Sequence, residues 1–201
     1  MKKSLTPQLE RNVQLLFEVG SLKNTQRGWK QHLGECANTI EHTYRVMWIA
    51  LILARMEGVK NEEKIMKMAL VHDIADTRTT ELSYVQKVYQ EDVGDKPVGD
   101  MLFLTSLAGL FEEYKEYSLR SSIESKIVKD ADNLDVDLEL KELEEKGSTL
   151  PKKWSSFRKM VRSKKLYTES SKKLWDAIQV TDVASWHLEC NKWLRKPNAG
   201  K

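Results

Sequence analysis

The sequence predicts an all-α protein. The chain has 201 residues but only 9 glycines and 4 prolines, fewer turn-forming residues than a β-sandwich or a glycine-rich nucleotide fold needs. Apolar side chains recur every three to four residues in successive segments, which is the spacing of one helix face. Several of these segments begin at a capping residue and end at a glycine. The length favours a single domain, and the glycine motifs of P-loop and Rossmann proteins do not occur.

The N-terminal helix is expected over about residues 6–20. Thr6 and Pro7 form a cap and first-turn pair at its start. Its apolar positions at helical spacing are Leu9, Val13, Leu16 and Phe17. An irregular loop is expected over 23–37, where no helical period is present.

A helical hairpin is expected next. Asn38 and Glu41 resemble a capping box at the start of a helix that extends to about residue 57, where Gly58 ends it. Asn61 caps the following helix. Because the connection between them is short, the two helices are expected to be antiparallel neighbours.

The rest of the chain is expected to be helical as well, with less regular stretches between the helices. The expected helices cover about 83–90, 97–114, 121–146, a basic segment from Pro151, and 168–194.

The net charge of +3 hides two blocks of opposite sign. Residues 130–145 contain eight acids and one lysine, and residues 152–173 contain nine bases and one acid. Most of the acids are expected to be solvated. Aromatic residues are interleaved with the basic block, at Trp154, Phe157 and Tyr167, so a helical nucleic-acid-binding protein stays open. The segment contains no recognisable helix-turn-helix or RNA-recognition motif.

Cysteine usage and hydropathy favour a cytoplasmic protein. Cys36 and Cys190 lie far apart and no signal peptide precedes them, which favours a reducing compartment. The longest apolar run, at 46–54, is too short to span a bilayer, so no membrane association is expected.

Two histidines and two aspartates fall at the inward faces of three expected helices. His42 shares a face with apolar residues 4, 7 and 11 positions later, and His72 with those 4 and 7 positions earlier. Asp73 follows directly, and Asp132 flanks the apolar stripe of its own helix. A single inward histidine is more often a hydrogen-bonded core residue, so it is the joint pattern that indicates a site. Two buried carboxylates require compensation, and this donor set suits Mn²⁺, Fe²⁺, Co²⁺, Ni²⁺ or Zn²⁺, with Mg²⁺ as a further candidate.

These four residues resemble the H…HD…D signature of the HD-domain metal-dependent phosphohydrolases. The stretches LVHDIA at 70–75, FEEY at 111–114 and ESKIVKDADNLD at 124–135 resemble the branch with bacterial 5′-deoxynucleotidases and their eukaryotic HD-domain relatives. Arg27-Gly28-Trp29 resembles the Arg/Trp element of that branch, upstream of the first histidine.

The resemblance covers about residues 10–147 and implies a single HD-type helical bundle with a helical C-terminal extension over about 148–195. It implies hydrolysis of a (deoxy)nucleoside 5′-monophosphate to nucleoside and phosphate, and a homodimer, since relatives are commonly dimers. It also implies one divalent metal ion held by His42, His72, Asp73 and Asp132.

The resemblance implies two further acidic site residues. Asp76 stands where the branch has an acid that helps activate the attacking water, and Glu81 where a second acid contacts the substrate or a second-shell water. The branch normally has Glu first and Asp second, so their order is reversed here, and Thr80 replaces the usual glycine. Specificity for deoxynucleotides therefore stays open.

Three more residues complete the expected site. Arg27 is expected to clamp the phosphate through two hydrogen bonds, and Trp29 to stack on a base or to wall the pocket. Arg78 either contacts the phosphate or pairs with Asp76 or Glu81.

Two other functions remain open besides nucleic-acid binding. One is hydrolysis of a different phosphate ester or nucleotide, because fold alone does not decide the substrate. The other is a degenerate HD domain that binds a nucleotide without cleaving it.

Overall fold

The computed structural model describes residues 5–30, 37–91, 93–189 and 193, and the regular elements within these ranges are helices. The predicted all-α class is confirmed. The α-helices are α1 (Pro7–Gly20), α2 (Thr39–Met56), α3 (Glu62–Val71), α4 (Asp76–Thr79), α5 (Lys96–Leu102), α6 (Leu110–Leu119), α7 (Ile123–Glu145), α8 (Leu150–Lys164), α9 (Glu169–Val180) and α10 (Ser185–Glu189). Short 3₁₀ turns lie at Ser21–Asn24, Gly28–Lys30 and Gln86–Val88.

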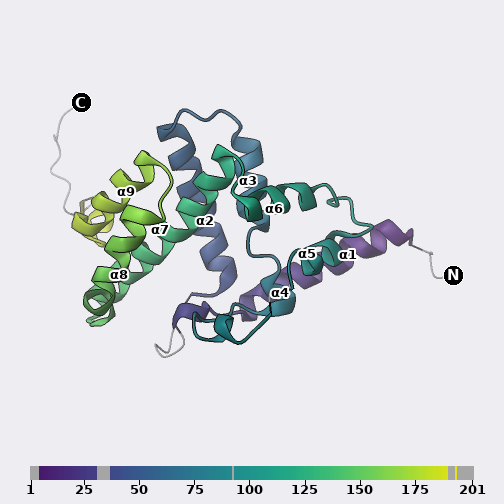
Figure 1. Ribbon diagram of the computed structural model, residues 1–201, viewed down its shortest axis with the longest axis horizontal. Coiled ribbons are helices and arrows are strands. Elements are labelled where there is room, and N and C mark those ends of the chain that lie inside the picture. The colour runs from purple at the N-terminus through teal and green to yellow at the C-terminus, as the bar shows by residue number, and fades with distance from the viewer. Residues whose placement is uncertain (1–4, 31–36, 92, 190–192, 194–201) are drawn as a thin grey trace.

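The bundle is built around α2 and α7. In Figure 1, α8 and α9 lie on one side of these two helices, whereas α1, α4 and α5 lie on the other. Fully buried residues of α2, α3 and α7, among them Leu53, Ile65 and Leu134, share one core with Trp175 of α9. A second core joins α1, α5 and α6 to the end of α3.

The expected helix boundaries are confirmed where capping residues mark them. The Thr6 side chain accepts a hydrogen bond from the Leu9 N–H, and Asn38 forms the capping box with Glu41. Gly58 follows α2 with a φ of 71°, a left-handed conformation that favours glycine.

The prediction of one helix over 97–114 is wrong, because a non-helical segment separates α5 from α6. The Thr105 hydroxyl donates to the Leu102 carbonyl and accepts from the Leu107 N–H, and Ser106 exchanges two hydrogen bonds with Asn12 of α1. These side chains supply hydrogen bonds that compete with those of a continuous helix. The spacing of apolar residues along the sequence does not reveal such hydrogen bonds.

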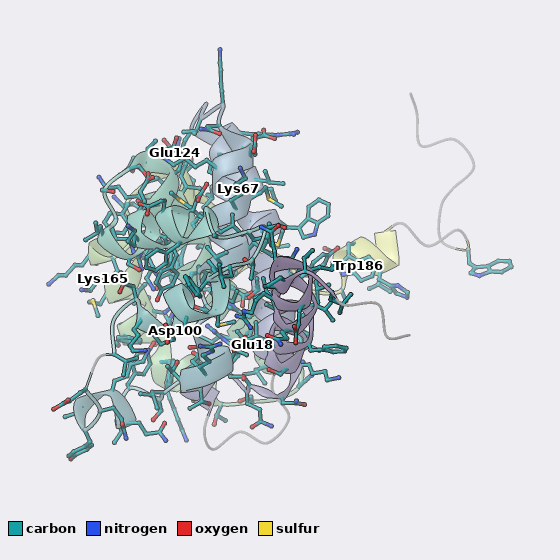
Figure 2. The ribbon with its side chains drawn as sticks, turned by 90° about the vertical axis from the view of Figure 1, so that its right-hand side faces the viewer. Glu18, Lys67, Asp100, Glu124, Lys165 and Trp186 are labelled. Carbon is teal, nitrogen blue, oxygen red and sulfur yellow. The ribbon has the colours of Figure 1, made fainter. Side chains whose placement is uncertain are left out.

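Two other expected helices are shorter than predicted. The helix expected over 83–90 is reduced to the 3₁₀ turn Gln86–Val88, with Val85, Val88 and Tyr89 exposed. The helix expected over 168–194 is interrupted after α9, where the Asp182 side chain accepts from the Ala184 N–H. Beyond the break, α10 lies at the edge of the molecule, with Trp186 projecting from it (Figure 2).

The expected solvation of the acidic block is also wrong. Asp130, Asp135, Asp137 and Glu139 of α7 are all buried. The two charge blocks pack together, since Arg158 of α8 donates to both carboxylate oxygens of Asp137, at 3.0 and 2.5 Å. Opposite charges that look separate in the sequence therefore form a buried ion pair.

The first helix does not bury the apolar positions that its spacing marks. Leu15 is its buried residue, whereas Leu9, Val13, Leu16 and Phe17 are exposed, Phe17 by 78%. No helix within the described ranges is long and apolar enough to cross a membrane. Cys36, Cys190 and part of the expected loop at 23–37 lie outside the described residues.

Candidate active site

The four expected metal ligands meet at one point. His42 lies in the first turn of α2, His72 and Asp73 directly follow α3, and Asp132 lies in α7. Each offers one ligand atom, and these atoms lie within 4.8 Å of one another. The His42 Nε2 atom is 3.4 Å from Asp73 Oδ2, 3.3 Å from Asp132 Oδ1 and 3.3 Å from His72 Nε2.

Both imidazoles are oriented as metal ligands require. The Nδ1 atom of His72 donates to the Ala69 carbonyl at 2.7 Å, and Nδ1 of His42 donates to Asp135 Oδ2 at 2.5 Å. A carbonyl or carboxylate can only accept, so Nδ1 carries the proton and the Nε2 lone pairs face each other within the cluster. Two facing lone pairs between two carboxylates fit one divalent cation.

The charge of the cluster also calls for a cation. Burial by itself would lower the pKa of His42, but contacts with Asp132, Asp135 and Asp73 outweigh burial and raise it. Negative charge is therefore in excess around this buried ring.

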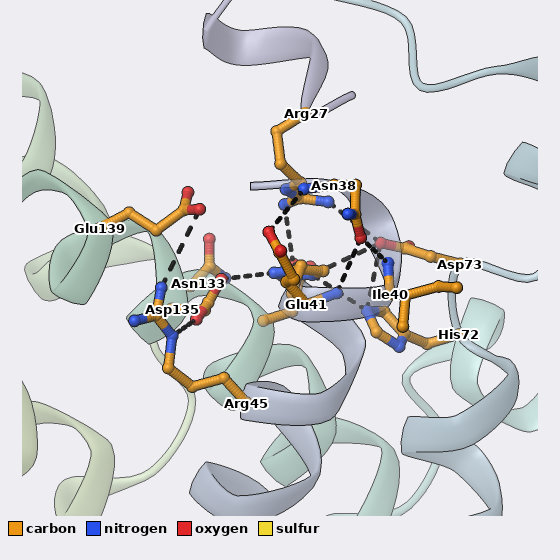
Figure 3. Close-up of polar contacts among 12 residues, drawn as sticks. Arg27, Asn38, Ile40, Glu41, Arg45, His72, Asp73, Asn133, Asp135 and Glu139 are labelled. Atoms are coloured by element: carbon orange, nitrogen blue, oxygen red, sulfur yellow. Dashed lines mark hydrogen bonds and ion pairs between the residues drawn. The ribbon is translucent and has the colours of Figure 1, made fainter. Parts of the chain in front are cut away.

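Asp135 and Arg45 belong to the site, although the expected set of site residues did not include them. Asp135 accepts from His42 through one oxygen and from Arg45 Nε through the other, and Arg45 also lies 3.9 Å from Glu139 (Figure 3). A further contact joins Arg45 Nη1 to Glu142 at 2.5 Å. The signal was available, because Asp135 follows Asp132 by three residues and so shares its helix face.

Arg27 lies directly above the cluster. Its side chain is 5% exposed, and Nη1 lies 3.2 Å from Asp73 Oδ2 (Figure 3). The same Nη1 atom lies 2.8 Å from Glu81 Oε2. Its Nη2 lies 3.8 Å from Asp132 Oδ1. Burial opposes the charge, but Glu81, Asp73 and Asp132 together raise the pKa of Arg27. A permanently charged donor is thus held beside the expected metal ligands.

A glycine makes this placement possible. A Cβ on Gly28 would lie 2.6 Å from the Glu81 carbonyl oxygen and 2.8 Å from the Leu82 carbonyl carbon. Because both are backbone atoms, any side chain at residue 28 would push the Arg27 loop away from the Glu81 segment.

The two expected acids lie on either side of a strained residue. Thr80 has a φ of 57°, so the backbone keeps a left-handed conformation at the position where the resemblance led us to expect glycine. Burial, together with the charges of Asp73 and Glu81, raises the pKa of Asp76 to about 8. Burial also raises the pKa of Glu81, against the effect of Arg27.

Arg78 pairs with neither acid. Its guanidinium binds Glu18 of α1, with Nη2 donating to Oε2 at 3.1 Å. The expected pairing with Asp76 or Glu81 is therefore wrong, although Arg78 still lines the cavity.

A cavity of about 1020 Å³ opens beside the cluster. It is lined by charged groups, including Arg27, Asp76, Glu81 and Lys129, and by the aromatic rings of Trp29 and Tyr84. The Trp29 ring also packs on Trp154 of α8, with centroids 5.3 Å apart. Trp29 thus both walls the cavity and packs against the C-terminal helices.

The comparisons with known proteins show the family of the chain. A family model described as HD domain matches residues 19–175. The 5′-deoxynucleotidase HDDC2 of Danio rerio is 30% identical over 145 residues, 68% of this chain and 72% of that protein. The 5′-deoxynucleotidase hdd1 of Schizosaccharomyces pombe is 31% identical over 140 residues, 64% of this chain and 70% of that protein. A conserved hypothetical protein from Pyrococcus furiosus has a TM-score of 0.68 at 26% identity, covering 83% of this chain and 98% of that one.

The helical fold and the match to the HD domain model define a metal-dependent phosphohydrolase, and the His-and-Asp cluster could hold the metal ion. The chain belongs to the HD domain family.

Proposed function

We propose that this protein hydrolyses nucleoside 5′-monophosphates, deoxynucleotides among them, to nucleoside and inorganic phosphate. One observation carries the proposal: the four-residue cluster opens into a cavity that presents both a buried arginine and aromatic rings. A phosphate and a base require this combination. The relatives named 5′-deoxynucleotidases support the same substrate class.

The metal ion would be held by His42, His72, Asp73 and Asp132. Mixed imidazole and carboxylate donors fit Mn²⁺, Co²⁺, Fe²⁺, Ni²⁺ or Zn²⁺, with Mg²⁺ as a further candidate. When bound, the ion supplies Lewis acidity toward the phosphate and lowers the pKa of a water.

Asp76 is the proposed general base. Its raised pKa suits proton transfer near neutral pH. Asp76 accepts a proton from the attacking water, whose oxygen forms the new bond to phosphorus. The bond between phosphorus and the 5′ oxygen breaks, and Asp76 returns the proton that it accepted to that oxygen as the nucleoside leaves.

Arg27 and Glu81 form the phosphate-binding side of the site. The 2.8 Å ion pair between them fixes the direction of the guanidinium, so that its remaining N–H groups are available for phosphate oxygens. Arg78 is held by Glu18, so we assign the main phosphate contact to Arg27. Trp29 is proposed to contact the nucleoside from the cavity wall.

The decisive experiment measures bound metal and phosphate release in parallel. Ribo- and deoxynucleoside monophosphates are supplied with added Mn²⁺ or Co²⁺. Asp73→Ala should lose both metal and activity, whereas Asp76→Asn should retain metal and lose about 10²-fold or more in kcat. The matched control Asp100→Asn removes an exposed carboxylate paired with Lys96 and should retain both properties.

The outcomes separate the alternatives. Absence of activity on every nucleotide, with metal bound, contradicts the proposal and favours a binding protein. Release from other phosphate esters alone favours a different HD hydrolase. Full activity in Asp76→Asn shows that Asp76 is not the base.

The basic block gives little support to a nucleic-acid partner. Arg158 is buried on Asp137, and Arg162 pairs with Asp176. Trp154 and Phe157 pack on each other with ring centroids 6.0 Å apart. We therefore propose a small nucleotide as the partner, and salt-dependent binding of a duplex would contradict this.

We further propose a homodimer and a cytoplasmic location. One face of α2 exposes Tyr44, Trp48, Ile52 and Met56 at intervals of four residues, Trp48 by 57%. A continuous exposed apolar stripe of this kind is typical of an interface. Sedimentation of the wild type and of Trp48→Glu tests the dimer, which should dissociate in the variant. Fractionation of cells that produce the protein tests its location.

A further inference from the structure

We infer that Arg120 and Lys129 form a phosphate-binding subsite at the edge of the active-site cavity. This inference deepens the proposed nucleotidase function and rests on it for the identity of the substrate. It assigns a role to a residue at the end of α6 that was not among the expected site residues.

Arg120 is held in place by unusual local structure. It follows α6 with a φ of 54°, a left-handed conformation that usually belongs to glycine at a helix C-terminus. Its Cζ atom lies 3.7 Å from the ring centroid of Tyr117. The Tyr117 ring in turn lies edge-on to His72, with centroids 5.7 Å apart. The guanidinium is therefore linked to the metal cluster through a single ring.

No acid within the described ranges forms an ion pair with Arg120. Its Nη1 atom is buried and has no hydrogen-bond partner. Leaving a buried charged donor unsatisfied is costly. Arg120 nevertheless lines the cavity, where a bound anion would reach it.

Lys129 adds a second cation beside Arg120. Its Nζ donates to Asp132 Oδ2 at 2.6 Å, and Lys129 and Arg120 both line the cavity. Lys129 thus connects this part of the cavity to a carboxylate of the proposed metal cluster. An anion that contacts both cations would relieve their repulsion.

Phosphate is the anion that fits best. The planar guanidinium presents two parallel N–H donors, and the ammonium adds a compact charge, which together match several oxygens of one tetrahedral group. Arg27 approaches Asp132 Oδ1 and Lys129 contacts Oδ2, so the two cationic groups lie at different oxygens of one ligand. The group bound by Arg120 is either the phosphate that is cleaved or a second phosphate of the nucleotide.

Binding of inorganic phosphate to the Co²⁺-loaded protein, measured by calorimetry, tests the subsite without requiring turnover. Arg120→Gln and Arg120→Gly should each weaken binding about 10- to 100-fold, the usual range for a lost charge-assisted hydrogen bond. Glycine accepts the left-handed backbone, so Arg120→Gly should fold even if Arg120→Gln does not. Arg55→Gln, which removes an exposed arginine paired with Glu62, is the matched control and should bind as the wild type does.

A second arm distinguishes the two sources of phosphate. Nucleoside mono- and diphosphates are titrated into Asp76→Asn protein with and without Arg120→Gly. Weaker binding of both nucleotides assigns Arg120 to the cleaved phosphate, and weaker binding of the diphosphate alone assigns it to a second phosphate. Unchanged affinities for inorganic phosphate and both nucleotides overturn the inference. Arg120-dependent phosphate binding in a protein that cleaves no nucleotide contradicts the proposed function and leaves the subsite intact.

Discussion

Replacing Asp135 with asparagine should weaken metal binding, although Asp135 is not one of the four proposed ligands. The carboxylate is fully buried, and each of its oxygens accepts one hydrogen bond, from His42 Nδ1 and from Arg45 Nε. An amide of the same shape offers one oxygen and one NH₂ group. Either His42 or Arg45 must then face a donor, and His42 loses the negative partner that fixes its tautomer.

The structure gives the expected size of this effect. A buried hydrogen bond to a charged group contributes about 1.5–3 kcal/mol. Loss of a carboxylate behind a metal-binding histidine typically lowers metal affinity about 10- to 100-fold, which corresponds to about 1.4–2.8 kcal/mol. The two ranges agree, so we expect the metal Kd of Asp135→Asn to rise by one to two orders of magnitude.

The assay is a competition titration of Zn²⁺ or Co²⁺ against a chromophoric chelator. Glu142→Gln is the matched control, because Glu142 contacts Arg45 at 2.5 Å and has no contact with His42. The control should retain its metal affinity to within about twofold, as expected for an exposed ion pair. An unchanged Kd in Asp135→Asn, or an equal loss in both variants, refutes the role of Asp135.

Three further predictions concern the loop, the helix packing and the charge of the site. Gly28→Ala should cost about 1–3 kcal/mol of stability by overpacking and should also lower activity. The control Gly20→Ala places no atom within 4 Å of the new Cβ and should not destabilise the protein. Equal urea midpoints of the two variants would contradict this prediction. Arg158→Met should lower the free energy of unfolding, measured by urea denaturation, by about 3–5 kcal/mol because it leaves Asp137 buried and unpaired. Adding Asp137→Leu should recover most of this stability. If the double variant recovers none, the ion pair is not the cause of the loss. Arg27→Gln should lower the Tm of the metal-free protein, since the site carboxylates lose their buried cation, and saturating metal should raise the Tm more than in the wild type. If metal raises the Tm of both proteins equally, Arg27 does not compensate the negative charge of the site carboxylates.

Local helix signals were predictable because they depend on neighbours in sequence. The Asn38–Glu41 capping box, the glycine after α2 and the inward positions of His42 and His72 all follow from spacings of three or four residues. The meeting of the proposed ligands also followed, because inward faces of neighbouring helices converge on one core.

Pairings between distant segments were not predictable in the same way. Asp137 was expected to be solvated with most of the acids of its block, and the structure buries it on Arg158 of the basic block. Arg78 had two acids close in sequence, yet its partner is Glu18 from α1. Sequence spacing cannot rank such partners, because their separation depends on how whole helices dock.

The sequence by itself determined the helical class, since capping and periodicity act over a few residues, and its resemblance to the HD signature named the four residues of the proposed metal centre. Only the tertiary structure decided which charges have partners. It placed Arg27 over the cluster through the close approach at Gly28, and it left Arg120 on Tyr117 without a counter-ion among the described residues. The physical reason is that the electrostatic energy of a buried charge depends on distance and burial in space, neither of which is encoded in separation along the chain.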